Sequence, residues 1–423
     1  MSHDAPRVSV VMATWGRGRH ILPSVQSVLR QSFATFELLV VGDATTDETE
    51  AVVTAIGDPR IRWLNLAERC GSQSAPNNAG IAAARSRIIA YLGHDDVWEP
   101  SHLAAVAGCF GSSAVPDFVV SGLLSHMPNG MPGSRVQGLF TEDNAKHRYF
   151  FPPSSFAHRR DVIDRIGPWK MPMEVRAPVD EDLLLRAAAA DLRFISTGIV
   201  TVHKFTSAVR YLSYAQQRSE EQAAVLADIA APGHEERVAD MVAEARRTGK
   251  YMIEMARKYD HFAPGQLARY NAAKRGLLRP ELCPLGRGSV IRHRREDGAL
   301  DWEKRPYFGV KRHAQNPQPR LLLPILAEAP AVLTFRAVHP ERTALGPLAM
   351  RCNEVAIQAE PQGLRPSPWG WSARYEADVR LLRDNASVLE LRLTPAQARK
   401  VPVGPAQLGF GIGPLQLRPK RPG

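Results

Sequence analysis

The chain has few cysteines and no long apolar run. Its four cysteines are scattered among 423 residues without CxxC spacing. They are Cys70, Cys109, Cys283 and Cys352. This spacing excludes a cysteine zinc site and fits reduced thiols of the cytosol. The sequence also lacks an apolar run of 18 residues, and residues 1–6 lack the apolar segment of a signal peptide. We therefore expect a cytoplasmic protein.

The length and the charge distribution predict several domains. A chain of 423 residues that is 44% apolar and 23% charged can bury more than one core. Residues 1–245 hold 23 Lys/Arg and 28 Asp/Glu, a net charge of −5, whereas residues 246–319 hold 17 and 7, a net charge of +10. The basic surface therefore lies outside the N-terminal part of the chain.

The first hundred residues alternate between short apolar runs and helical stretches. We expect strands at residues 8–12, 36–41, 61–64 and 88–92, and helices at 21–31, from 48 onward and at 78–87. This alternation is typical of an α/β fold with a mostly parallel sheet flanked by helices. Ligands of such sheets bind beyond the carboxyl ends of the strands. Thr14, Asp43 and Asp95 all fall at these ends.

Two adjacent carboxylates, Asp95 and Asp96, follow the apolar strand at residues 88–92. Mg²⁺ and Mn²⁺ prefer carboxylate oxygens and keep coordination sites for substrate phosphate. The pair therefore indicates an enzyme that binds a nucleoside diphosphate through a metal. The alternative is a solvated turn or the N-cap of the helix that begins near Ser101.

A second acidic cluster, Asp180, Glu181 and Asp182, precedes the helical run at residues 183–190. One of these carboxylates is a candidate general base. Negative charge in the first turn of a helix is also favoured by the helix dipole. The cluster alone therefore leaves open whether these residues catalyse a reaction or merely cap the helix.

Taken in order, several segments resemble the family 2 glycosyltransferases, the large inverting group with the GT-A fold. The matching segments are residues 8–15 with 27–33, then 36–47, 78–82, 91–100 and 179–186. The resemblance implies transfer of a sugar from a nucleoside diphosphate sugar, expected to be a UDP-sugar, to a hydroxyl of a glycan or lipid-linked acceptor. It also implies Mn²⁺ or Mg²⁺ as the cofactor.

The resemblance assigns the donor site to the strand ends. It places Ala13 and Thr14 against the nucleotide, Asp43 at the base or ribose, and Asp95 on the metal. His94 belongs to the same site, where it could supply a ligand suited to Mn²⁺ or hydrogen-bond the backbone.

The remaining roles fall on the second half of the match. The Leu-Leu-Arg ending after the acidic cluster places the catalytic base at Asp180 and leaves Asp182 to orient the helix. His203 lies where many relatives carry a histidine that reaches the metal or the diphosphate; otherwise it is a polar residue at the end of a strand. Trp169 could stack on an acceptor sugar or pack in the core.

Two acids that are typical of the family are missing. Gly42 stands before Asp43 where relatives usually carry an acid, and Gly93 replaces the first acid of an Asp-x-Asp. These losses favour a second hypothesis, a catalytically degenerate, glycosyltransferase-like protein that binds glycans or acts as a scaffold. Retention of Asp43, Asp95 and Asp180 together favours the enzyme, because a decayed site has no reason to keep all three.

Beyond the resemblance, we predict a catalytic domain at residues 1–215, a helical and basic connector at 216–319 and a β-sandwich at 320–423. The β-sandwich is predicted from short alternating apolar runs. With Trp369, Trp371 and Tyr375 on or near its strands, this domain has a general resemblance to jelly-roll accessory modules. Its alternative role is packing or oligomerisation without sugar binding.

The connector carries a cluster of basic residues. They are Arg287, Arg292, Arg294, Arg295, Lys304, Arg305, Lys311 and Arg312. The cluster could contact an anionic membrane surface or an acidic glycan, or form a solvated linker face. No recognised nucleic-acid motif accompanies the charge, so we do not expect nucleic acid as a partner. The oligomeric state cannot be predicted from the sequence.

Overall fold

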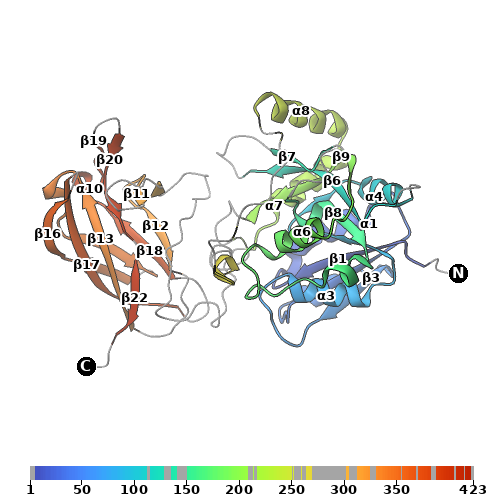
Figure 1. Cartoon of the computed structure of the whole chain (residues 1–423), viewed down its shortest axis with the longest axis horizontal. Helices are drawn as coiled ribbons and strands as arrows, with labels where there is room; N and C mark the ends of the chain where they lie inside the picture. Colours follow the sequence, from blue (N-terminus) through green and yellow to red (C-terminus); the bar gives the residue numbers. More distant parts are fainter. Residues whose placement is uncertain are drawn as a thin grey trace. The chain divides into compact units, whose positions relative to one another are not determined.

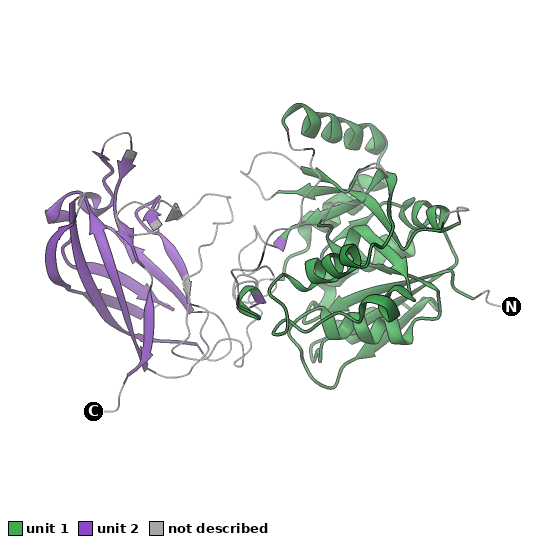
Figure 2. Ribbon diagram, in the orientation of Figure 1, with its two compact units in different colours: residues 1–127, 132–206, 216–267 green, residues 128–131, 207–215, 268–423 purple. Residues whose placement is uncertain are grey.

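The computed structural model forms two compact units (Figure 1, Figure 2). Unit 1 contains residues 1–127, 132–206 and 216–267, and unit 2 contains residues 128–131, 207–215 and 268–423. The structure describes residues 5–111, 115–127, 135–140, 150–207, 213, 217–249, 251, 259, 263–268, 302–303, 312–323, 330–353, 355–367, 370–382, 387–403, 406–413 and 415–420.

Unit 1 is built on one mixed sheet. Its strands are β1 (Val8–Thr14), β2 (Phe36–Gly42), β3 (Ile61–Asn65), β4 (Ile88–Tyr91), β5 (Val97–Trp98), β6 (Phe118–His126), β7 (Arg135–Gln137), β8 (Phe156–Arg159) and β9 (Phe194–Phe205). The strand order is β3-β2-β1-β4-β8-β6-β9-β5, with β7 paired to β6. Strands β1 to β4, β6 and β9 run in one direction, and β5, β7 and β8 run in the opposite direction.

Helices cover both faces of this sheet because β1 and β2 are apolar on both sides. The helices are α1 (Leu22–Leu29), α2 (Thr49–Thr54), α3 (Ser74–Ala83), α4 (His102–Phe110), α5 (Val162–Ile166) and α6 (Val179–Ala189). Val10 packs in a core cluster with residues of α1 and α4. Its neighbour Val11 packs in a second cluster with residues of α3 and α6. Such continuous apolar strands are typical of sheets that are buried on both faces, and the predicted fold class is confirmed.

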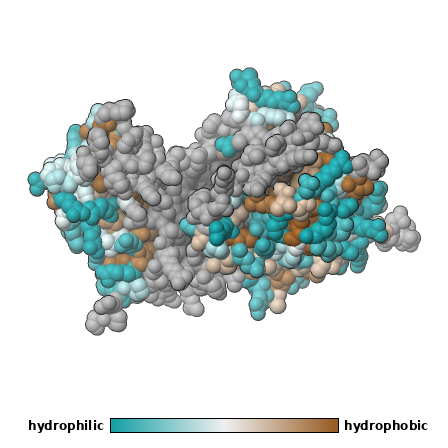
Figure 3. All heavy atoms as spheres, viewed as in Figure 1, coloured by the Kyte–Doolittle hydropathy of each residue, from teal (hydrophilic) through white to brown (hydrophobic). Residues whose placement is uncertain are grey.

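Two further helices, α7 (Glu220–Ile229) and α8 (His234–Arg247), complete unit 1. Between them, Gly233 adopts a left-handed conformation with φ of 75° at the N-cap of α8. α8 lies over β7 at the top of unit 1 (Figure 1). Its buried residues are His234 and Ala245, and most of its visible surface is hydrophilic (Figure 3).

Unit 2 is a β-sandwich whose two antiparallel sheets share one core. One sheet contains β10 (Trp302–Glu303), β11 (Arg312–Ala314), β13 (Pro330–His339), β16 (Pro361–Ser367), β17 (Gly370–Arg380), β21 (Gly411–Ile412) and β22 (Gln416–Pro419). The other contains β12 (Arg320–Leu323), β14 (Leu348–Cys352), β15 (Val355–Ala359) and β18 (Ser387–Arg392). A separate ribbon pairs β19 (Val401–Val403) with β20 (Ala406–Leu408).

The aromatic residues singled out in this region have different surroundings. Tyr375 is fully buried and donates a hydrogen bond of 2.8 Å to the carbonyl of Gly346. Trp371 is half-buried, and the guanidinium of Arg342 lies 4.9 Å from its ring centroid. Trp369 lies outside the described residues, as do all members of the basic connector cluster except Arg312. In the described part of the chain, no helix is long and apolar enough to cross a membrane.

Candidate active site

The carboxyl ends of β1 and β2 meet at Asp43. The amide of Asp43 donates a hydrogen bond of 2.8 Å to the carbonyl of Thr14. Its carboxylate accepts one hydrogen bond of 2.7 Å from the amide of Cys70 and another of 2.7 Å from the amide of Gly71. The side chain is buried, so these amides hold a fixed, charged acceptor at the predicted nucleotide position.

Thr14 and His94 are brought together at this edge of the sheet. Oγ1 of Thr14 lies 3.0 Å from Nδ1 of His94, and both residues are buried. Ala13 precedes Thr14 on β1 and pairs with Val41 of β2. The hydrogen-bond partner of His94 is thus a side chain that the sequence assigned to the same site.

Asp95 and Asp96 differ in their surroundings. Asp96 is fully buried, and its carboxylate accepts hydrogen bonds from Nζ of Lys204 at 2.7 Å, from the amide of Phe205 at 3.0 Å and from the hydroxyl of Ser154. Burial raises the pKa of Asp96, while the ammonium of Lys204 opposes this shift. Asp96 therefore holds in place the loop that contains Asp95, the residue that the family resemblance assigns to the metal.

Neighbouring side chains crowd the two glycines at which the chain departs from the family pattern. A Cβ atom at Gly93 would lie 2.9 Å from Oδ2 of Asp96 and 3.0 Å from Oδ1 of Asp95. A Cβ atom at Gly42 would lie 2.4 Å from Oδ1 of Asn65. That amide oxygen accepts a hydrogen bond of 3.0 Å from the amide of Thr45. Other polar side chains therefore occupy the room that acids at positions 42 and 93 would need.

The predicted base, Asp180, lies in the first turn of α6, as the sequence indicates. The residue is half-buried, and its Oδ1 accepts a hydrogen bond of 3.1 Å from the amide of Glu181. Glu181 is buried, and its carboxylate accepts a hydrogen bond from the hydroxyl of Tyr259. A backbone amide thus orients Asp180 and a tyrosine hydroxyl binds Glu181, while Asp182 pairs with an arginine.

Asp182 is paired with Arg186 one turn along α6, at 2.8 Å. Arg186 also donates hydrogen bonds to the carbonyls of Ile166, Gly167 and Pro168. These bonds tie α6 to the chain that follows α5. The contacts suit the predicted role of Asp182 in orienting the helix.

Trp169 packs in the core and does not face an acceptor. Its side chain is 1% exposed, and its Nε1 donates a hydrogen bond of 3.1 Å to the hydroxyl of Tyr91. Its backbone is fixed by Asn78, which accepts from the amide and donates to the carbonyl, both at 2.9 Å. Of the two alternatives left by the sequence, the structure supports core packing.

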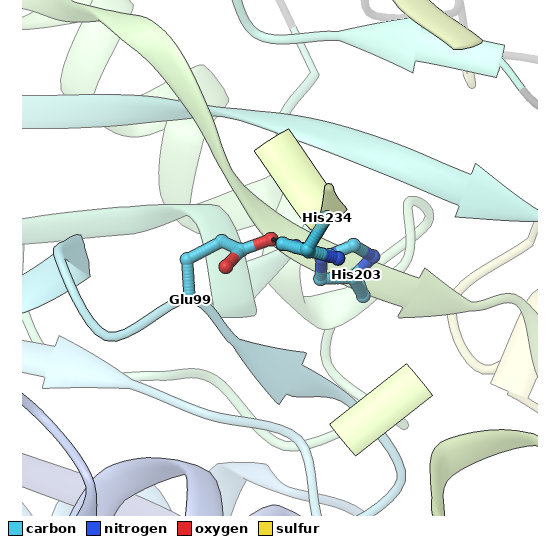
Figure 4. A group of neighbouring side chains, drawn as sticks. All are labelled: Glu99, His203 and His234. Atoms are coloured by element: carbon cyan, nitrogen blue, oxygen red, sulfur yellow. Dashed lines mark hydrogen bonds and ion pairs between the residues drawn. The ribbon is translucent and has the colours of Figure 1, made fainter. Parts of the chain in front are cut away.

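His203 lies in a separate buried cluster (Figure 4). Its Nε2 is 2.7 Å from Oε1 of Glu99, and its Nδ1 is 2.8 Å from Nε2 of His126. Nε2 of His234 is 2.6 Å from the same oxygen of Glu99. The adjacent residue Lys204 reaches Asp96, and successive side chains of a strand point to opposite faces. The structure thus brings His203 to Glu99 and His234, while its neighbour serves the Asp95–Asp96 loop.

Hydrogen bonds set the charges of this cluster. Burial opposes ionisation of Glu99, but hydrogen bonds from His203 and His234 lower its pKa below the usual range. Burial also opposes protonation of His234, yet hydrogen bonds to Glu99 and Asp228 raise the pKa of that imidazole. The hydrogen bonds thus shift the two pKa values in opposite directions, that of Glu99 downward and that of His234 upward.

Sequence reasoning missed several residues that shape the site. Lys204, Ser154 and Gln222 contact the Asp95–Asp96 loop, and Nε2 of Gln222 donates a hydrogen bond of 3.0 Å to the carbonyl of Asp95. All three are far from the loop in sequence. Of the three, only Lys204 could have been noticed in the sequence, because it directly follows the candidate residue His203.

The arginines near β1 are also positioned by contacts. Arg17 is 2% exposed, and its Nη2 donates a hydrogen bond of 3.3 Å to the carbonyl of Arg218. The guanidinium carbon of Arg69 lies 3.6 Å from the ring centroid of Trp15, a close cation–π contact. Neither side chain is a freely solvated surface arginine.

Residues 9–118 match the family model described as glycosyl transferase family 2. The succinoglycan biosynthesis protein ExoO of Rhizobium meliloti is 42% identical over 98 residues, which are 23% of this chain and 28% of that protein. The UDP-Glc:α-D-GlcNAc-diphosphoundecaprenol β-1,3-glucosyltransferase WfgD of Escherichia coli is 37% identical over 91 residues, 22% of this chain and 36% of that protein.

Among solved structures, S. aureus TarS 1–349 in complex with UDP-GlcNAc is 18% identical and has a TM-score of 0.41. The match covers 47% of this chain and 58% of that chain. The chain thus spans 28% of the length of ExoO and 36% of the length of WfgD. The match to the family model, residues 9–118, lies in unit 1 and includes Thr14, Asp43, His94 and Asp95.

Proposed function

Because the N-terminal domain of this chain is that of a family 2 glycosyltransferase, we propose that the chain transfers a sugar from a UDP-sugar to a hydroxyl of a glycan or lipid-linked acceptor. The observation that carries the proposal is the grouping of Thr14, Asp43, His94 and Asp95 at the carboxyl ends of neighbouring strands. This edge is where open α/β sheets bind their ligands.

Asp43 is suited to recognise the nucleotide. Its two carboxylate oxygens are fixed by the amides of Cys70 and Gly71. Each oxygen can still accept a second hydrogen bond, as from a base N–H or a ribose hydroxyl. The activity for which WfgD is named, a transfer from UDP-Glc to α-D-GlcNAc-diphosphoundecaprenol, supports a uridine donor and a lipid-linked acceptor.

The residues near Asp95 fit a divalent cation. Mg²⁺ is commonly held by one or two carboxylates together with substrate phosphates, and this loop carries two carboxylates, Asp95 and Asp96. His94 precedes Asp95 in the chain and offers an imidazole nitrogen. Carboxylate oxygen suits Mn²⁺ better than imidazole nitrogen does. When bound, the cation would neutralise charge on the leaving diphosphate. Asp96 and Lys204 hold the loop that presents Asp95.

Asp180 is the proposed base. Inverting transfer needs a carboxylate that accepts the proton of the acceptor hydroxyl as its oxygen attacks the anomeric carbon, while the bond to the diphosphate breaks. Asp180 is half-buried at the start of α6, with one oxygen oriented by the amide of Glu181. Asp182 is engaged by Arg186 and is the poorer candidate.

The second hypothesis, a degenerate transferase-like scaffold, rests on Gly42 and Gly93. The structure weakens the reason for it, since Asn65, Asp95 and Asp96 occupy the space beside these glycines. An intact polar site with different packing is a simpler account than decay. The β-sandwich and the basic connector remain proposed accessory regions for acceptor or membrane contact.

Calorimetric titration of UDP with and without Mn²⁺ tests the proposal. We expect Mn²⁺-dependent binding that Asp95→Ala abolishes and that Asp240→Ala, a change at an exposed position on α8, leaves intact. Asp96→Asn should weaken binding less than Asp95→Ala. Equal affinity of the wild type and the Asp95 variant would contradict the assignment of Asp95. Absence of nucleoside diphosphate binding in the folded wild type would contradict the proposed function.

A further inference from the structure

Three buried side chains from separate elements converge at one point of unit 1 (Figure 4). Glu99 follows β5, His203 lies on β9, and His234 is the first residue of α8. Nε2 of His203 and Nε2 of His234 lie 2.7 Å and 2.6 Å from the same Oε1 of Glu99. One potential ligand atom from each residue lies within 4.8 Å of the others.

The donor set suits a borderline cation. Two imidazole nitrogens and one carboxylate oxygen are ligands that Zn²⁺ accepts, with a fourth position for water. Mg²⁺ and Ca²⁺ prefer oxygen ligands throughout. Glu99, His203 and His234 are 9%, 2% and 7% exposed. A cation held by flexible surface side chains would not have ligands as buried as these.

The outer contact of His234 with a carboxylate is typical of metal-binding histidines, and His203 has a second histidine as its outer partner. Nδ1 of His234 is 2.8 Å from Oδ2 of Asp228, and Nδ1 of His203 is 2.8 Å from Nε2 of His126. Metal-ligating histidines usually hydrogen-bond through the ring nitrogen that does not bind the metal, which fixes the ring orientation. Here these contacts direct both Nε2 atoms toward Glu99.

We propose that Glu99, His203 and His234 form a Zn²⁺ site that clamps α8 to the catalytic sheet. The other buried residue of α8 is Ala245, near its far end, which packs with Leu124 and Val136. A link at His234 therefore fixes the start of a helix that is exposed over most of its length. The inference is independent of the proposed sugar transfer.

The clamped helices also contact loops of the donor side. Gln222 of α7 binds the carbonyl of Asp95 at 3.0 Å. Ser219, just before α7, lies 3.0 Å from His20. α7 and α8 are joined by the short segment at residues 230–233, so a cation at the start of α8 also restrains the end of α7.

The competing hypothesis, drawn from the sequence, places His203 on the donor metal together with Asp95. The two assignments predict different ligand sets. A site shared with Asp95 does not need His234 or Glu99, whereas the clamp needs both and does not need Asp95.

Zinc binding by the full-length, chelator-treated protein tests the inference without any nucleotide. We expect one equivalent of Zn²⁺ per chain in competition with a chromophoric chelator, and a rise in Tm of about 5 °C at saturating Zn²⁺. Glu99→Gln and His234→Gln keep the side-chain size and should weaken binding by more than about 100-fold, because loss of an outer partner alone costs about 10- to 100-fold. Asp228→Asn should weaken it by about 10-fold.

The matched controls are Asp95→Asn and His20→Gln, which should bind Zn²⁺ like the wild type. Co²⁺ bound in place of Zn²⁺ should give visible d–d bands without a thiolate charge-transfer band, which excludes the cysteines as ligands. Circular dichroism establishes that each variant is folded. Asp228→Asn tests the site without replacing a proposed ligand, because Asp228 contacts only the outer ring nitrogen of His234. Stoichiometric binding that survives Glu99→Gln and His234→Gln, binding lost in Asp95→Asn, or absence of binding in the folded wild type would each overturn the clamp.

Discussion

Nζ of Lys204 lies 2.7 Å from Oδ2 of Asp96, across a separation of 108 residues in the sequence. Asp96 is fully buried, whereas the side chain of Lys204 is 20% exposed. The carboxylate also accepts hydrogen bonds from the amide of Phe205 and the hydroxyl of Ser154. This arrangement compensates one of two adjacent negative charges, so the loop can present Asp95 without the full repulsion of a carboxylate pair.

Lys204→Met should therefore destabilise the protein. The change leaves a buried carboxylate without its counter-charge, for which we expect a loss of about 3 kcal/mol in the free energy of unfolding. Urea denaturation followed by tryptophan fluorescence measures it. Arg247→Met breaks an exposed pair with Glu244 and should cost less than about 1 kcal/mol. Similar losses in the two variants would show that the Lys204–Asp96 pair contributes no more than a surface ion pair.

Gly93→Asp should impair the protein although it restores the acid that relatives carry. The new Cβ atom would lie 2.9 Å from one carboxylate oxygen and 3.0 Å from another, and its own carboxylate would add a third negative charge. We expect a lower Tm and at least about tenfold weaker binding of UDP with Mn²⁺, because like charges at short distance repel. Gly108→Ala, in a helix with open space around that position, is the control and should not lower the Tm. A gain in affinity for Gly93→Asp would refute the packing argument.

The sequence predicted the first four strands of unit 1 and the start of α6 because their signals are local. Apolar runs marked β1, β2 and β4 within about two residues, and the acids before the leucines of α6 marked its first turn. Both ends of the helix predicted at residues 78–87 were misplaced, since α3 ends at Ala83. α3 begins at Ser74, earlier than predicted, because Pro76 is tolerated in the first turn of a helix.

Pairings between distant residues could not be predicted in the same way. β8 lies between β4 and β6 and is antiparallel to both, an order that no periodicity encodes. Glu99 and His234 are 135 residues apart, and each alone resembles an ordinary polar residue beside a strand or helix. The metal-ligand pattern becomes visible once the fold brings these residues to one point.

Glu37 should make the stability of unit 1 depend on pH. It is buried and accepts hydrogen bonds from Oγ of Ser9 at 2.7 Å, the amide of Arg85 at 2.6 Å and Nη1 of Arg62 at 2.7 Å. Burial opposes its ionisation, but these bonds together hold the pKa of Glu37 below its usual value of 4.5. The folded-state pKa is thus below the unfolded one, so the stabilisation is present above pH 4.5 and is lost as the pH falls through the folded-state pKa.

Glu37→Gln should accordingly cost about 2 kcal/mol at pH 7, and the difference from the wild type should shrink as the pH falls below 4.5. Urea unfolding at a series of pH values measures this difference. Glu50→Gln, at an exposed position on α2, should show a small and nearly constant difference. A Glu37 effect that is independent of pH would mean that shape, and not charge, is what the site requires.

Asp180 and Asp182 should separate catalysis from structure. Asp180→Asn keeps the shape of the side chain and loses the proton acceptor, so turnover should fall by about 10²-fold or more while donor affinity stays nearly constant. Asp182→Asn breaks the pair with Arg186 and should lower the free energy of unfolding by about 1 kcal/mol with a much smaller loss of turnover. Release of UDP in the presence of acceptor, calorimetry with donor and thermal unfolding measure the three quantities. The reverse pattern would make Asp182 the base, and unchanged turnover in both variants would contradict a carboxylate base in this cluster.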